Sequence, residues 1–358
     1  MNTALRVLLV LVGCVGLFVY FRSIVRMMLL NRRERDVLER IAARFVIVIM
    51  HGLASGKRSQ SEVKHVQAWL MPMFIFTIVA IWFVLVQFSF GLILWGVRVE
   101  PNLGQAFIAS GSALSTLGFH TPNTTAGEWL AIGEAAIGLG IVILLFTFVP
   151  GYQSAIQARE RKGGWLASRT TQTEPSCVGL LRSLQRSGQT DDASVWLEWE
   201  SWFRGLLETH SISPVLAYVP SIYRGNWVDT ATTILDAASL LLVSGDSQHT
   251  EGPRLCREAG IAAVRSIAAE LIGDREQRQA DELSSADANA SLLALHDQLH
   301  RVGLPVAADK DRWVQSFAAL RKDYISDLRH ISRATLMPIM EPWERPPADE
   351  QPRAGDKR

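Results

Sequence analysis

Residues 102–119 read NLGQAFIASGSALSTLGF, a small, apolar and uncharged segment. Long apolar stretches flank it at 69–97, which carries no charge, and at 129–158, which carries one acid, Glu134. A helix needs about 20 apolar residues to cross the hydrocarbon core of a bilayer, so both stretches predict membrane spans. An uncharged segment between two spans predicts a loop that re-enters the membrane, where irregular backbone is tolerated if it lines a water-filled path.

A third apolar stretch, 7–21, lies between Arg6 and Arg22 and is short for a span. Arginines at its ends can reach the headgroups, so we expect an N-terminal anchor. The alternative is a lipoprotein cleavage box at 11–14, which reads LVGC. An uncleaved anchor fits better, because the apolar run continues past Cys14.

Basic residues are distributed unevenly around these spans. Residues 22–68 carry ten of them against four acids, whereas 98–128 carries only Arg98. The positive-inside rule therefore places 22–68 and the C-terminal half in the cytoplasm. The N-terminus and 98–128 are expected outside, which predicts a multi-pass protein of the inner (plasma) membrane. The apolar run at 36–53 is too short to span, and it predicts an interfacial helix.

Four residues of the central segment, Thr116-Leu117-Gly118-Phe119, resemble the Thr-Val-Gly-Tyr selectivity filter of potassium channels. A predicted helix at 103–115 precedes them, as the pore helix does in that family. The resemblance implies that backbone carbonyls from four copies of the chain replace the water around a monovalent cation, K⁺. It implies a homotetramer that needs no other cofactor.

The last span and the end of the filter extend this comparison. Gly127, Glu134 and Gly138 have the spacing of the inner helix of bacterial potassium channels. Glu134 is then a structural or permeation-linked carboxylate, or else a solvated acid near the helix start. Gly138 is a gate hinge or a close-packing point. His120 stands where the family has a second glycine; it predicts a loop residue rather than a metal ligand, because no other histidine or cysteine is near in sequence.

The C-terminal half has the pattern of a helical, water-soluble domain. The run at 227–244 is apolar, but two acids within it favour a core helix over a span. Residues 341–358 are rich in proline and charge, which predicts disorder. Helices are expected at 176–187, 191–210, 212–224, 227–244, 253–273, 283–302 and 308–336.

A second resemblance covers residues 150–245, which look like the cytosolic tail of a group of bacterial channel-like membrane proteins. It names no cytosolic ligand. The matching residues are Pro150-Gly151-Tyr152, Arg159-Glu160, Glu200-Ser201-Trp202, His210, Trp227-Val228-Asp229 and Leu235-Asp236-Ala237.

Composition and motifs exclude other classes of protein. The net charge of +1 gives no basic field for nucleic acid. Phosphate-binding glycine loops, HExxH and GxSxG are absent from the sequence, so we predict that the chain is not an enzyme. Cys14, Cys177 and Cys256 have no metal-binding spacing.

The sequence therefore predicts an all-α membrane protein with a two-span pore-loop unit and a helical cytosolic domain. The expected function is passive cation conduction, and the alternative is a non-conducting sensor or scaffold on a channel-derived frame. The expected domains are an anchor (1–24), a cytosolic or interfacial linker (25–68), the pore module (69–155), the helical cytosolic domain (156–340) and a tail (341–358).

Overall fold

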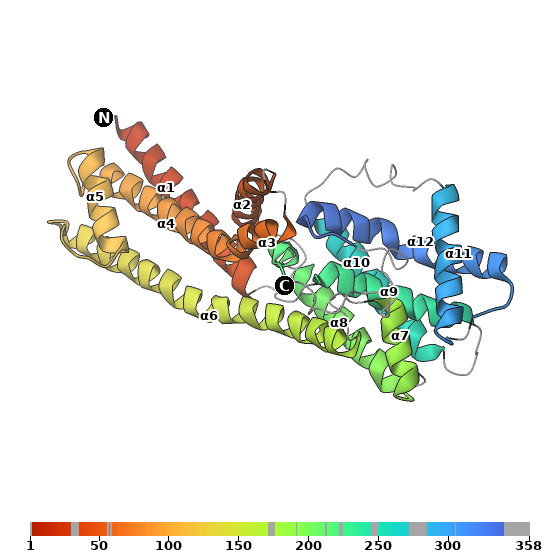
Figure 1. The fold of residues 1–358 in the computed structure, drawn as a ribbon. Coiled ribbons are helices and arrows are strands. Elements are labelled where there is room, and N and C mark those ends of the chain that lie inside the picture. The colour runs from red at the N-terminus through yellow and green to blue at the C-terminus, as the bar shows by residue number, and fades with distance from the viewer. Residues whose placement is uncertain are drawn as a thin grey trace, which may run out of the picture. The chain divides into compact units, whose positions relative to one another are not determined.

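The structure is a computed structural model, and its described residues fold entirely into helices, turns and connecting segments without a strand (Figure 1). The predicted all-helical class is confirmed. The chain divides into two compact units, residues 1–154 and 155–358, each of which is described by itself. Described residues are 2–29, 36–55, 57, 59–170, 176–190, 192–211, 213–221, 225–244, 250–271, 285–304 and 306–339.

The first unit consists of a bundle of apolar helices with two short amphipathic helices at one end. One helix, α6, begins in this unit and continues into the second. The elements are α1 (Thr3–Ile24), the π-helix η1 (Val25–Leu29), α2 (Val37–Ala54), α3 (Gln60–Ala68), α4 (Leu70–Gly96), α5 (Leu103–Leu114) and α6 (Thr125–Thr170).

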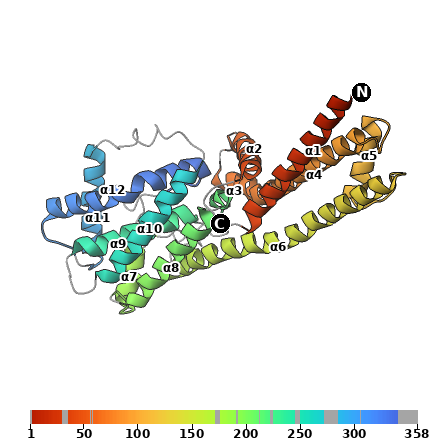
Figure 2. The same ribbon diagram turned by 180° about the vertical axis from the view of Figure 1, so that it is seen from behind.

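The helices α1 and α4 pack antiparallel, and they lie side by side in Figure 1 and in the reverse view of Figure 2. Gly16 faces Ser89, and Val10 faces Gly96 further along α4. A Cβ added at Gly13 would lie 2.6 Å from the carbonyl oxygen of Ser89, so the two backbones approach too closely for a larger residue. Small residues at such contacts are typical of helices that pack within membranes.

Among the described residues, four helices are long and apolar enough to cross a membrane: Thr3–Met27, Ser61–Gly96, Thr125–Thr170 and Trp227–Ser244. The first helix is longer than the apolar run at 7–21, because the helix continues through the arginines at both ends of that run. The last of the four has 78% of its apolar window buried inside the second unit, as expected for a core helix.

The second unit is a helical domain. The predicted helix at 212–224 is wrong: the described part of it holds only a 3₁₀ helix that begins at a proline, followed by extended chain. Residues 341–358, predicted to be disordered, lie outside the described residues. The elements are α7 (Cys177–Arg186), α8 (Ala193–His210), the 3₁₀ helix η2 (Pro214–Tyr218), α9 (Trp227–Ser244), α10 (Glu251–Glu270), α11 (Ser285–Arg301) and α12 (Lys310–Thr335).

The core of this domain is built around α9, which packs against α7, α10 and α12. One of its acids, Asp236, is buried and pairs with Arg321 of α12 at 2.9 Å. The Tyr324 hydroxyl donates a second hydrogen bond to Asp236 at 2.7 Å. A buried carboxylate needs such partners, which explains how α9 carries an acid in a core.

Candidate functional site

The helix α5 lies against α4 at the end of the bundle opposite to α3 (Figure 1). The Asn102 side chain begins α5 by accepting a hydrogen bond from the Gln105 N–H at 2.8 Å. Gly111 makes the approach to Gln87 of α4 possible, since a Cβ there would lie 2.8 Å from the Gln87 amide nitrogen. The Ser110 hydroxyl also bonds to the carbonyl oxygen of Gln87, at 3.0 Å. These contacts position the residues that follow α5.

Residues 115–118 turn sharply after α5 and adopt an unusual backbone. Thr116 and Gly118 have positive φ values of 58° and 67°. The N–H groups of Leu117 and Gly118 both point at the carbonyl oxygen of Ser112, at 3.1 and 3.2 Å. In a trans peptide the N–H and the preceding C=O point in opposite directions. The carbonyl oxygens of Thr116 and Leu117 therefore point together, away from α5.

The next turn of the loop is held by the same serine. The Ser112 hydroxyl accepts a hydrogen bond from the His120 N–H at 3.0 Å, so the carbonyl of Phe119 also points away from this hydroxyl. The His120 ring bonds through Nε2 to the Glu100 carboxylate at 3.1 Å, and Glu100 is buried. The sequence predicted neither the role of Ser112 nor the contact between His120 and Glu100. A partner for His120 could have been sought at Glu100, because it is the one acid in the sequence between α4 and α5.

The side chains of Leu117 and Phe119 point away from the rest of the chain. Their exposed fractions are 71% and 69%, so the chain's own helices leave most of both uncovered. The resemblance to the filter of potassium channels implies that Phe119 packs outward against neighbouring helices, and the described helices of the chain leave this side chain mostly uncovered.

The two inner-helix residues lie where α6 meets α5. Glu134 is completely buried and accepts a hydrogen bond from the Ser110 hydroxyl at 2.5 Å. The interpretation of Glu134 as a solvated acid is therefore wrong, because its carboxylate is buried against Ser110 of α5. A Cβ added at Gly138 would fall on the carbonyl oxygen of Leu114, which favours a close-packing role for this glycine.

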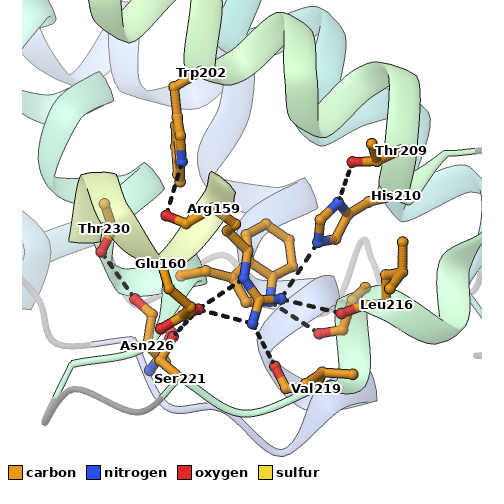
Figure 3. A network of polar contacts seen from close by, with 12 residues as sticks. Arg159, Glu160, Trp202, Thr209, His210, Leu216, Val219, Ser221, Asn226 and Thr230 are labelled. Carbon is orange, nitrogen blue, oxygen red and sulfur yellow. Dashed lines mark hydrogen bonds and ion pairs between the residues drawn. The ribbon is translucent and has the colours of Figure 1, made fainter. Parts of the chain in front are cut away.

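A second polar cluster lies in the second unit and is centred on Arg159 of α6 (Figure 3). This buried guanidinium pairs with Glu160 at 2.9 Å and donates to the carbonyl oxygens of Leu216 and Val219 at 3.1 and 2.9 Å. The cluster joins the end of α6 to η2 and to the extended chain after it. The Arg159 guanidinium also donates a hydrogen bond to His210 Nε2 at 3.3 Å.

Two tryptophans complete this cluster, which we call the arginine network. The Trp202 indole donates to the carbonyl oxygen of Arg159 at 3.2 Å. The Trp227 ring lies 5.9 Å from the guanidinium carbon and 5.6 Å from the His210 ring centre. Residues that the second resemblance singled out from three distant parts of the sequence thus meet in one place.

The hydrogen bonds of His210 define its protonation. Arginine can only donate, so Nε2 accepts from Arg159 and Nδ1 carries the proton. Nδ1 then donates to the Thr209 hydroxyl at 2.8 Å, which donates to the carbonyl oxygen of Gly205 at 2.7 Å. Burial lowers the pKa of His210 well below 6.5, and the charge of Arg159 lowers the pKa further. The ring is neutral at pH 7.

Among the described residues, no group of three His, Cys, Asp or Glu side chains is placed to hold a metal ion. A comparison of the chain with protein-family models, with curated proteins and with solved structures finds no match.

Proposed function

We propose that the chain is one subunit of a homotetrameric pore in the inner membrane that conducts monovalent cations passively, with K⁺ as the permeant ion. The observation that carries the proposal is the direction of the backbone carbonyls of Thr116, Leu117 and Phe119. The N–H groups of Leu117 and Gly118 both donate to the carbonyl oxygen of Ser112. The carbonyl oxygens of the same two peptide units, those of Thr116 and Leu117, therefore both point away from Ser112. Rings of such oxygens replace the hydration shell of a cation.

The electrostatics of α4 and α5 favour a cation at the same place. The filter residues follow the C-terminal end of α5, where the helix dipole carries partial negative charge. Neither α4 nor α5 carries a charged side chain that would repel a cation. A single loop cannot surround an ion, so several copies must meet on an axis. The uncovered side chains of Leu117 and Phe119 supply apolar surface for packing between copies.

The distribution of charge supports an orientation for the pore. Ten basic residues in 22–68 place α2 and α3 in the cytoplasm by the positive-inside rule. The loop between α4 and α6 then faces outward, and the second unit is cytoplasmic. The second unit has a net formal charge of −4, from 24 basic and 28 acidic residues in 155–358, and no ligand is proposed for it.

The experiment is a potassium flux assay on the full-length protein in liposomes, with two glycine variants compared. Gly118→Ala forces a side chain into left-handed backbone, which costs about 1–2 kcal/mol and turns the carbonyls. We expect this variant to insert and assemble normally and to lose flux. Gly133→Ala is the matched control, because a Cβ there meets no atom within 4 Å.

Two results would contradict the proposal. One is wild-type protein that is inserted and tetrameric yet passes no cation, which would favour a non-conducting sensor or scaffold. The other is Gly118→Ala flux equal to that of wild type, which would place any conduction path elsewhere.

A further inference from the structure

The helix α2 has two apolar faces, and the protein covers only one of them. The covered face includes Ala43, Val46 and Met50 and packs against α4. The opposite face carries an uncovered apolar row whose residues recur at helical spacing, with exposed fractions of 53% to 63%. This outer row consists of Val37, Ile41, Phe45 and Val48.

Two arginines border the outer row. Arg40 and Arg44 are exposed and lie one turn apart along one edge of the row. Among the described residues, neither guanidinium has an ion-pair partner. A row of apolar side chains with unneutralised cations along its edge is typical of helices that lie at an anionic membrane surface.

The position of α2 follows from its contacts. Ser23, near the end of α1, accepts from the Trp82 indole at 3.2 Å and donates to Asp36 at 2.6 Å. Asp36 is the residue that begins α2. The end of α1 therefore lies level with Trp82. The part of α4 from Leu70 to Trp82 extends beyond that level by about 18 Å, at about 1.5 Å per residue. The helix α2 therefore begins beside the middle of α4, and α3 joins it to the end of α4 that Trp69 marks.

Tryptophan and basic side chains also occur at the turn between α2 and α4. Trp69, between α3 and α4, is 66% exposed, and tryptophan is typical of the membrane–water interface. Beside it is a hollow of about 390 Å³, lined by Lys57, Ser61, Glu62, His65, Val66 and Trp69.

We infer that the outer row of α2, with Arg40 and Arg44, is a docking surface for anionic phospholipid in the cytoplasmic leaflet. The apolar side chains enter the boundary between headgroups and acyl chains, and the guanidiniums bind the lipid phosphates, which accept their hydrogen bonds. A second copy of α2 is a poorer occupant, because it would bring two further arginines against the first two. The inference rests on the membrane orientation proposed above and not on conduction.

The test is native mass spectrometry of the delipidated full-length protein titrated with phosphatidylglycerol or with phosphatidylcholine of the same acyl chains. Wild type should bind phosphatidylglycerol more tightly. At about 1 kcal/mol per basic residue, Arg40→Gln/Arg44→Gln should weaken that binding about 30-fold and leave phosphatidylcholine binding unchanged. Arg40→Lys/Arg44→Lys should keep most of the preference. Arg182→Gln/Arg186→Gln, on α7, removes the same charge elsewhere and should have no effect.

Equal binding of the two lipids by wild type would overturn the inference, as would an unchanged preference in the glutamine variant. Displacement of the lipid by glycerol phosphate at equal concentration would mean that the site binds free phosphate rather than a lipid. If Ile41→Asn/Phe45→Asn lost subunit association but kept its lipid binding, the face would belong to a second copy. None of these readouts needs ion flux, so a protein that fails to conduct can still pass this test.

Discussion

Ser112 is the residue on which the geometry of residues 116–120 depends. Its carbonyl oxygen accepts from Leu117 and Gly118, and its hydroxyl accepts from His120. The carbonyl contacts need only a backbone, but the hydroxyl contact needs serine or threonine at this position. The side chain of Ser112 therefore controls the outer part of the loop separately from the inner part.

Ser112→Ala should reduce the preference for K⁺ over Na⁺ while the protein stays folded and conducting. The variant removes the acceptor of the partly buried His120 N–H, at a cost of about 1 kcal/mol, and frees the Phe119 carbonyl to turn. Reversal potentials in mixed K⁺ and Na⁺ would measure the change. Ser168→Ala is the control, because the Ser168 hydroxyl bonds only to the carbonyl oxygen of Trp165 in its own helix turn, away from the loop. Equal selectivity in both variants would show that the Ser112 hydroxyl does not contribute to the preference for K⁺ over Na⁺.

His210 should make the stability of the second unit fall in acid. Its pKa is lowered in the folded state by burial and by the charge of Arg159. Below about pH 6.5 the histidine is therefore protonated in the unfolded chain while it stays neutral in the folded chain. Stability is complete above that pH and falls as the pH drops, by up to about 1.4 kcal/mol per unit. Thermal midpoints between pH 7.5 and 5 should fall less steeply in His210→Gln than in wild type. A wild-type slope retained by His210→Gln but lost by His300→Gln, at an exposed site, would contradict this.

Most of the helices could be predicted from apolar periodicity and capping residues. Six of the seven helices expected after residue 175 are present at similar bounds, because each carries a clear stripe or a capping residue. The exception, at 212–224, failed because apolar residues around Pro214 were read as a helix, although they fill space beside the arginine network. The helix α6 continues through Pro150 to Thr170, well past the apolar stretch at 129–158. A proline removes one hydrogen bond, and the bonds on either side of it outweigh that loss.

Thiol labelling can test directly which segments face the outside of the cell and which face the cytoplasm. In a Cys14→Ala background the remaining cysteines, Cys177 and Cys256, are buried and silent. We expect Asn123→Cys, in the loop before α6, to react with an impermeant thiol reagent on intact cells. Leu197→Cys, exposed on α8, should react only after the membrane is opened. The reverse pattern would invert the topology.

For the whole molecule, the sequence predicts the filter segment and the membrane spans but not the contacts that connect them. Thr116 to His120 could be singled out because an uncharged, glycine-containing segment between spans is unusual. Ser110, Ser112 and Glu100 could not, since serine is common on helices and their partners lie up to 24 residues away. The arginine network could not be predicted either, because Arg159 and Val219 are brought together only by the folding of the domain.

The central claim is that four copies of this loop form a path for cations. Its most direct test is electrical recording from the full-length protein in a planar bilayer with a K⁺ gradient. The account predicts discrete unitary currents that reverse near the K⁺ equilibrium potential, persist in Gly133→Ala and are absent from Gly118→Ala. A tetrameric, correctly inserted wild-type protein that gives no unitary current would contradict it.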